Sequence, residues 1–230
     1  MINTIYKTLY LLKKRQYVEL LERLLVKVTV KTKFISSWPS FLFYNRFYIL
    51  SKNKWTPQSG NNNIVIRSAG IQDIPALERF IRKKNDLNER FIKKHIGILA
   101  EINHNIVGMI WLELSNIHYE LKDQFYFKLP FNAGWAYDVY ISEDYRGKGV
   151  LNSLQNELFR QLNENSKKKA YCLVEALNHD AVRVHKLLGY TFEKEVVCFG
   201  ILRAIVHINI NTKGAKKLNG SNEAGRSKKQ

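Results

Sequence analysis

The chain has 230 residues, 45% of them hydrophobic, which is enough to bury a sizeable core. Its two cysteines, Cys172 and Cys198, exclude a disulfide-rich scaffold and a cysteine-based metal site, and they indicate a reducing compartment. No apolar stretch approaches the length of a membrane span, and residues 9–12 are too short for the core of a signal peptide. We therefore expect a cytoplasmic protein.

The formal net charge of +17 is unevenly distributed. Residues 1–60 hold 11 Lys and Arg against 2 acids, and residues 211–230 hold 6 against 1, whereas residues 61–210 hold 20 against 17. The centre is nearly balanced, and its strand and helix patterns predict one α/β domain over residues 64–210. The basic ends predict an N-terminal extension over residues 1–60 and a disordered tail over residues 211–230, because that tail is almost without apolar residues.

The N-terminal extension has the pattern of folded structure. Apolar residues at helical spacing over residues 5–24 predict a helix, and residues 26–30 and 41–50 have the patterns of strands. Residues 53–63, with proline, glycine and several asparagines, are expected to be a linker. We interpret the extension first as a module that packs on the domain. A surface for a membrane or protein partner is the second interpretation, and nucleic-acid binding is the least favoured.

The first elements of the domain are a strand, a helix and a hairpin. Residues 64–67 predict the strand, and residues 73–77 predict the start of the helix, with Asp73 as N-cap. Residues 98–102 and 106–110 are apolar runs on either side of an Asn-His-Asn turn, which is typical of a β-hairpin.

The most informative segment begins with an alternating strand over residues 135–141. The turn Arg-Gly-Lys-Gly follows at residues 146–149, and residues 150–162 have the apolar spacing of a helix. Such a turn presents backbone N–H groups at the positive end of a helix dipole, and glycine admits close approach of phosphate oxygens. The segment therefore predicts a pyrophosphate site, with an ordinary strand-to-helix turn as the alternative.

A second motif follows this helix. Asn178, Ala181 and His185 lie three and four residues apart, so they form one stripe along a helix. Gly189 then has the position of a C′ glycine that ends the helix.

In this order and at this separation, the two motifs resemble the acyl-CoA site of the GNAT superfamily of N-acyltransferases. The resemblance covers about residues 64–203. It implies a mixed, twisted central sheet with helices on both faces, and acetyl-CoA or another acyl-CoA as cosubstrate. By this resemblance Asn178 binds the pantetheine arm. The implied cosubstrate-binding residues are Val139, Tyr140, Ile141, Arg146, Gly147, Lys148, Gly149, Val150, Leu151 and Asn178.

The chain departs from the family pattern at two positions of the site. Leu151 stands where the phosphate motif usually has Gly or Ala, and His185 stands where the family commonly has the Tyr that protonates the departing thiolate. By position, His185 is therefore the expected general acid. An ordinary imidazole pKa near 6.5 leaves a minority of imidazolium at neutral pH, which is competent for this step. A structural helix histidine is the alternative.

Asp138 is the expected base or amine anchor, because it is the only carboxylate on the strand over residues 135–141. Strand alternation predicts that it faces away from Tyr137 and Val139. An exposed carboxylate without a catalytic role is the alternative, and Glu175 is a reserve base. Tyr190 is a reserve acid. Backbone N–H groups near Val139 are expected to stabilise the oxyanion.

The sequence thus predicts an N-acyltransferase that transfers an acyl group from acyl-CoA to a primary amine in a ternary complex. No metal is expected, because the other histidines lack ligand spacing with carboxylates or thiols. The acceptor is a small-molecule or peptide amine whose identity stays open, as does the oligomeric state. A CoA-binding protein without turnover, and a basic-surface binding module on the same scaffold, are the two rival functions.

Overall fold

The computed structural model describes residues 42–59, 63–81, 84–120, 125–201 and 204–210. These residues form an eight-stranded mixed sheet with the strand order β10-β9-β1-β8-β7-β4-β3-β2, and a separate two-stranded sheet. Within these ranges, no helix is both long and apolar enough to cross a membrane. The expected helix over residues 5–24, the strand over residues 26–30 and the tail from residue 211 lie outside the described residues.

One half of the sheet is an antiparallel meander of β2 (Val65–Ser68), β3 (Ile96–Ile102), β4 (Asn105–Glu113) and β7 (Ala133–Ile141). The predicted hairpin between β3 and β4 is confirmed. Its two turn residues, Asn103 and His104, have φ values of 50° and 62°. A two-residue turn with two positive φ angles matches the twist of the strands that it connects.

β7 and β8 (Lys169–Glu175) are the parallel pair at the centre of the sheet. Their ladder extends only from Ala133↔Lys169 to Trp135↔Tyr171, whereas β7 continues to pair with β4 as far as Ile141↔Gly108. The two central strands therefore diverge beyond Trp135. The edge of β7 that faces β8 has no ladder partner among the described residues from Ala136 onward.

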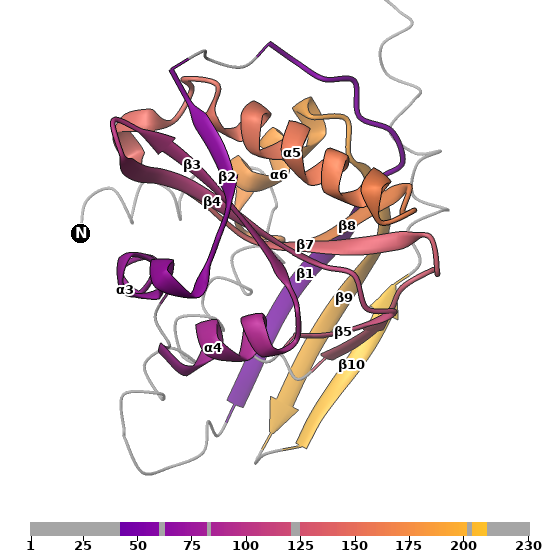
Figure 1. Cartoon of the computed structure of the whole chain (residues 1–230). Helices are drawn as coiled ribbons and strands as arrows, with labels where there is room; N and C mark the ends of the chain where they lie inside the picture. Colours follow the sequence, from indigo (N-terminus) through magenta and orange to yellow (C-terminus); the bar gives the residue numbers. More distant parts are fainter. Residues whose placement is uncertain (1–41, 60–62, 82–83, 121–124, 202–203, 211–230) are drawn as a thin grey trace, which may run out of the picture.

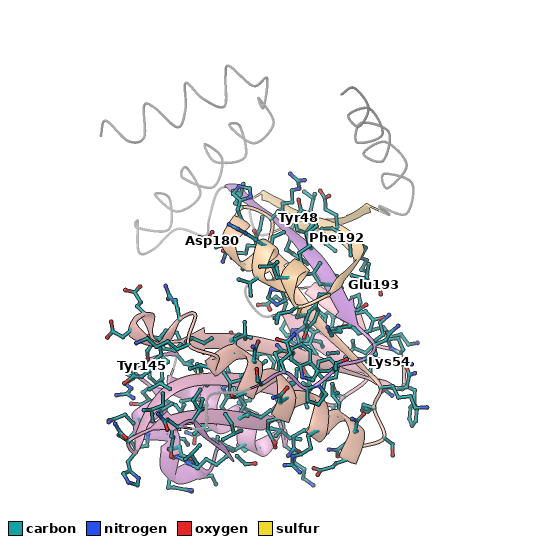
Figure 2. The ribbon with its side chains drawn as sticks, turned by 90° about the horizontal axis from the view of Figure 1, so that it is seen from above. Tyr48, Lys54, Tyr145, Asp180, Phe192 and Glu193 are labelled. Atoms are coloured by element: carbon teal, nitrogen blue, oxygen red, sulfur yellow. The ribbon has the colours of Figure 1, made fainter. Side chains whose placement is uncertain are left out.

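β1 (Leu42–Lys52) comes from the predicted N-terminal extension, yet it lies inside the sheet. It pairs antiparallel with β8 on one side and with β9 (Thr191–Ile201) on the other. Tyr48 of β1 and Phe192 of β9 lie side by side in Figure 2, and their ring centroids are 4.3 Å apart. The strand predicted for residues 41–50 is thus an integral part of the sheet. β10 (Ala204–Ile210) completes the sheet beyond β9.

The segment after β1 is held against α5 (Val150–Glu164). Trp55 Nε1 donates a hydrogen bond of 2.5 Å to Asn156 Oδ1, and the Trp55 ring stacks on Phe159 at 5.6 Å. Asn156 also exchanges two hydrogen bonds with the backbone of Gln58. Residues 53–59, expected as a linker, therefore pack on the domain.

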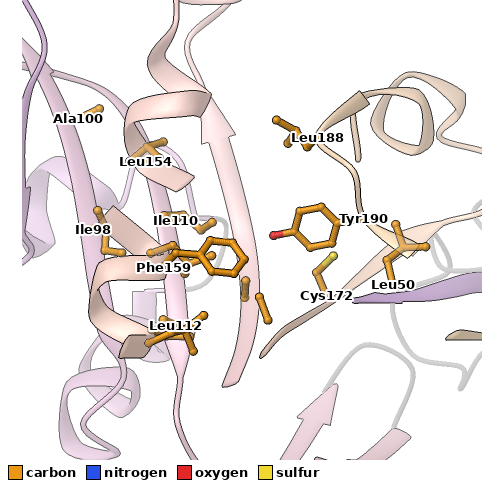
Figure 3. Packing of buried hydrophobic residues seen from close by; sticks show 14 of the residues in the cluster. Leu50, Ile98, Ala100, Ile110, Leu112, Leu154, Phe159, Cys172, Leu188 and Tyr190 are labelled. Atoms are coloured by element: carbon orange, nitrogen blue, oxygen red, sulfur yellow. The ribbon is translucent and has the colours of Figure 1, made fainter. Parts of the chain in front are cut away.

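α5 covers one face of the sheet (Figure 1), as its predicted apolar stripe requires. Val150, Leu154 and Leu158 are buried in a core that also holds Leu50 of β1 and Tyr190, shown in Figure 3. The helix approaches closely at Gly108, where an added Cβ would lie 2.8 Å from Val150 Cγ1. Gly108 therefore sets how near α5 lies to the sheet.

The opposite face is covered by the short helix α3 (Ile74–Leu77) and by α4 (Lys84–Ile92), whose buried residues pack on Trp111 and Met109. A hairpin of β5 (Ile117–Glu120) and β6 (Phe125–Lys128) connects β4 to β7 and buries Phe127 against Trp135. The structure confirms the predicted mixed sheet with helices on both faces. Both cysteines are buried free thiols, as predicted.

Candidate active site

The turn before α5 has the backbone that the phosphate motif predicts. Gly147 and Gly149 have φ values of 73° and 84°, which are strained for residues with a Cβ. Gly149 is the N-cap of α5, and no side chain caps the helix. No atom lies within 4 Å of the place that a Cβ on Gly147 would occupy. The first backbone N–H groups of α5 thus border an open, glycine-lined surface that fits a phosphate group.

Basic side chains flank this turn. Arg146 is exposed; its Nε donates to the carbonyl of Ile141 at 3.3 Å, and its guanidinium lies 3.6 Å from Glu143. Lys148 is exposed and lies 5.5 Å from the ring centroid of Tyr145. Leu151, the departure from the family motif, packs its side chain against the core cluster under α5. These residues give the turn a positive, solvent-accessible surface.

Val139, Tyr140 and Ile141 form the end of β7 next to this turn. Tyr140 and Ile141 pair with Met109 and Gly108 of β4, and β8 pairs with none of the three. Val139 is exposed, while Tyr140 packs its ring on Phe80 at 4.5 Å. Among the described residues, no strand therefore pairs with this end of β7 on the side where it diverges from β8.

Asp138 lies at a β-bulge of β7. The register changes from Trp111↔Tyr137 to Met109↔Tyr140, so β7 has one residue more than β4 here, and φ of Asp138 is 46°. Its carboxylate is 48% exposed and is hydrogen-bonded to Arg90 of α4. Arg90 also lies 4.9 Å from the ring centroid of Tyr137. Asp138 and Tyr137 thus contact the same guanidinium, because the bulge breaks the alternation that would place them on opposite faces.

Asn178 and His185 lie on α6 (His179–Leu187), at the predicted ends of one stripe. Asn178 is the N-cap, and its side-chain oxygen accepts from the N–H of Ala181 at 3.1 Å. His185 is half-buried, and its Nδ1 lies 2.8 Å from the carbonyl of Ala181. Because Nδ1 must donate to a carbonyl, Nε2 carries the lone pair in neutral His185. Burial lowers the pKa of His185, and the Ala181 hydrogen bond offsets this only partly.

The helix ends at Gly189, whose φ of 76° confirms the predicted C′ glycine. Tyr190 then turns inward to the core (Figure 3), and its hydroxyl donates to Gln155 of α5 at 3.0 Å. Burial raises the pKa of this hydroxyl well above its usual value. Glu175, the reserve base, is exposed at the end of β8. Tyr190, the residue before β9, thus connects that strand to α5 through the core.

A group of buried titratable residues that the sequence did not single out lies beside Asp138, on the α4 face. We call it the Glu113 network, and it consists of His95, Glu113, His118 and Tyr137. His118 Nδ1 lies 2.7 Å from Glu113 Oε2, and His95 Nδ1 lies 2.6 Å from the Tyr137 hydroxyl. His95 Nε2 lies 3.7 Å from Glu113 Oε1. Three elements and a loop thus bring four polar side chains together.

The network has a defined charge state. Burial lowers the pKa of His118, but hydrogen bonds and charges of Glu113 and Glu120 outweigh it and raise the pKa. Burial likewise opposes ionisation of Glu113, but hydrogen bonds from His118 and Ser115 lower its pKa. Burial lowers the pKa of His95, and the charge of Glu113 offsets this only partly. These directions favour an ion pair of Glu113 and His118, and burial favours a neutral His95 beside it.

A mixed sheet whose central parallel strands diverge beside a glycine-led helix N-terminus is the architecture of an α/β acyltransferase. The sequence comparison identifies which one: the model of the acetyltransferase (GNAT) family matches residues 70–190, slightly more than half of the chain. The chain belongs to this family, and membership supports acyl transfer with an acyl-CoA cosubstrate. A search of curated proteins finds no significant sequence match.

Solved structures share the fold at low sequence identity. A protein of the GNAT family from Novosphingobium aromaticivorans is 14% identical with a TM-score of 0.51, over 70% of this chain and 67% of that one. A conserved protein of unknown function from Staphylococcus epidermidis is 10% identical with a TM-score of 0.50, over 79% of this chain and 65% of that one. This chain thus spans about two thirds of either structure, and the likeness concerns the fold alone.

Proposed function

We propose that the protein transfers an acetyl group, or another acyl group, from acyl-CoA to a primary amine by direct attack within a ternary complex. The observation that carries this proposal is the open N-terminus of α5, led by Gly147 and Gly149, beside the unpaired edge of β7. Together they offer a site for a pyrophosphate and an extended strand edge along which a thioester arm can bind.

The cosubstrate is bound by main-chain and basic groups in this proposal. The N–H groups of Gly149, Val150 and Leu151 bind the pyrophosphate, with Arg146 and Lys148 adding positive charge. The backbone of residues 139–141 binds the pantetheine arm and stabilises the oxyanion that forms on the thioester carbonyl. The side-chain amide N–H₂ of Asn178 is available to the same arm, because the Asn178 oxygen caps α6.

Asp138 acts as the anchor of the acceptor ammonium. Its carboxylate is half-exposed while one oxygen contacts Arg90, so a second cation can bind it. Of the two roles expected for Asp138, base or amine anchor, we therefore assign it the role of anchor.

His185 protonates the departing thiolate. Its Nδ1 is fixed on the Ala181 carbonyl, so the imidazolium presents Nε2–H for donation. A lowered pKa makes it a stronger acid than free imidazole toward a thiolate whose usual pKa is about 8.5.

Two measurements, made one after the other, test the proposal. CoA, acetyl-CoA and longer acyl-CoAs are titrated in a thermal-shift assay; a ligand at 100 times its Kd stabilises the fold by about 2.7 kcal/mol. Release of CoA thiol from the best ligand is then followed with an amino sugar, an amino-acid amide, a peptide N-terminus and a lysine side chain as acceptors. Binding without transfer to any amine supports the CoA-binding rival, and no binding supports the basic-surface rival.

A further inference from the structure

Buried polar atoms without a hydrogen bond lie in and around the Glu113 network. Among the side chains that the structure describes, four such atoms lack a hydrogen bond: Arg90 Nη1, Trp111 Nε1, His118 Nε2 and Trp135 Nε1. Arg90 lies 4.9 Å from the ring centroid of Trp111, and the His118 ring stacks on Trp135 at 4.3 Å. Folded proteins leave few buried polar groups unpaired, and such groups often mark functional sites. Here His118 belongs to the network, where its Nε2 lies 3.8 Å from Glu120 Oε2, and Arg90 and Trp135 contact its members Tyr137 and His118.

The hydrogen bonds of the network have a direction. Glu113 Oε1 lies 3.7 Å from His95 Nε2 and favours the proton of the neutral imidazole on that nitrogen, so Nδ1 accepts from the Tyr137 hydroxyl. Glu113 in turn accepts from His118 and from the hydroxyl of Ser115. A histidine that accepts at one nitrogen and faces a carboxylate at the other is arranged to take up a proton.

The network begins next to the proposed anchor of the amine. Tyr137 precedes Asp138 on β7, and both contact the guanidinium of Arg90. An ammonium held by Asp138 therefore lies beside the same guanidinium that contacts the Tyr137 ring, whose hydroxyl starts the hydrogen-bonded series.

We propose that Tyr137, His95 and Glu113 form a proton relay that deprotonates the acceptor ammonium. The inference rests on the proposed function, because it assigns the base of that reaction. One N–H proton of the ammonium passes to the Tyr137 oxygen while the Tyr137 hydroxyl proton passes to His95 Nδ1. The imidazolium so formed pairs with Glu113 and later releases its proton to solvent. Tyr137 touches the substrate, whereas His95 and Glu113 are positioning and relay residues.

The remaining protons also balance. The free amine attacks the thioester carbonyl, the C–S bond breaks, and the second nitrogen proton is lost as the amide forms. The thiolate takes a proton from His185, which is restored from that second nitrogen proton through solvent. The sum is one amide, one CoA thiol and one proton from one ammonium and one acyl-CoA.

The charges around His95 permit this role. Burial keeps His95 neutral and ready to accept a proton, and Glu113 stabilises the cation afterwards. The titratable and charged groups around His95 are Glu89 and Arg90 of α4, Lys93 just after this helix, Glu113 of β4, His118 and Glu120 of β5, and Tyr137 and Asp138 of β7.

The test compares two nucleophiles in the full chain. Primary amines need deprotonation at neutral pH, whereas the nitrogen of hydroxylamine is already unprotonated. With the best amine of the panel, His95→Gln should lower kcat/KM about 100-fold or more at neutral pH. The deficit should shrink as pH rises toward the pKa of the amine. Transfer to hydroxylamine by this variant should stay near the wild-type rate. Tyr137→Phe should show the same loss with the amine and the same normal rate with hydroxylamine.

His104→Gln, the same change at the exposed turn of β3 and β4, is the matched control and should leave both rates unchanged. A structural role for His95 would lower the two rates equally at every pH, which would overturn the relay while the proposed function stands. Wild-type rates of transfer to the amine by His95→Gln and by Tyr137→Phe would also overturn the relay. No transfer to any nucleophile by the unmodified chain would overturn the proposed function and the relay together.

Discussion

Arg90 of α4 donates a hydrogen bond to the carboxylate of Asp138 at the bulge of β7. The guanidinium is buried between the rings of Trp111 and Tyr137, while the carboxylate is half-exposed. One partner of this ion pair is thus buried, and the other, the Asp138 carboxylate, is accessible from solvent.

If Asp138 anchors the ammonium, Asp138→Asn should raise KM for the amine about 10- to 100-fold and change kcat little. The reason is that a hydrogen bond to a charged group is worth about 1.5–3 kcal/mol. The affinity for acetyl-CoA should not change. Steady-state kinetics with the best amine measures both constants, and Glu164→Gln at an exposed position of α5 is the control. A fall in kcat alone would contradict the anchoring role.

Much of the fold was predictable because its signals are local. The strand over residues 135–141, the helix over residues 150–162 and the stop at Gly189 each depend on neighbours a few residues away, and each is confirmed, although the side chains of the strand do not alternate past Tyr137. The bulge at Asp138 was not predictable, because it depends on the register of β7 against β4. That register decides whether the Asp138 carboxylate lies on the same face of the sheet as the Tyr137 side chain.

The glycine turn gives a prediction that separates charge from shape. Gly149→Asp should abolish the thermal shift by acetyl-CoA, since it places a negative charge against the pyrophosphate. Gly149→Asn has the same size and tolerates the positive φ of 84° about as well, but it is neutral. Asn should therefore retain part of the shift. Equal binding by the Asp variant and the wild type, both folded by circular dichroism, would refute the site.

The Glu113 network was not predictable from sequence, since its members lie far apart in the chain. His95 follows α4, Glu113 ends β4, His118 begins the β5–β6 hairpin and Tyr137 belongs to β7. The short interval from Glu113 to His118 was the only local signal, and many surface loops have such spacing. Tertiary structure alone brings the four together and buries them.

The network predicts a characteristic pH dependence of stability. The lowered pKa of Glu113 contributes stability above its usual value of 4.5, which is lost as pH falls. The raised pKa of His118 contributes stability below its usual value of 6.5, which is lost as pH rises through the raised pKa. Glu113→Gln should therefore lower the free energy of unfolding most between pH 4.5 and pH 6.5, by about 3–5 kcal/mol, the usual cost of breaking a buried ion pair. Urea unfolding at pH 5.5 and pH 8.5 measures the difference, and a loss that is equal at both would contradict the ion pair.

The position of β1 predicts that residues of the N-terminal extension stabilise the domain. Ile49 is fully buried between β8 and β9, whereas Ile71 is 68% exposed. Ile49→Ala should lower the free energy of unfolding by about 2–5 kcal/mol, and Ile71→Ala should change it little. Deletion of residues 1–60 should prevent folding, and deletion of residues 1–41 should not, because the second leaves all eight strands. A stable chain that begins at residue 61 would show that β1 is dispensable.

His185 gives the most direct test of the chemistry. If it is the general acid, His185→Phe should lower kcat and kcat/KM together by about 10²–10⁴-fold and leave acetyl-CoA affinity unchanged. Because burial lowers its pKa below 6.5, the wild-type kcat should fall as pH rises above that lowered value, and the Phe variant should lose this limb. His185→Tyr, which restores the common family residue, should retain more activity than Phe. A Phe variant with wild-type kcat would show that His185 is structural. Tyr190→Phe then tests Tyr190 as the general acid in its place, and full activity of that variant would exclude Tyr190.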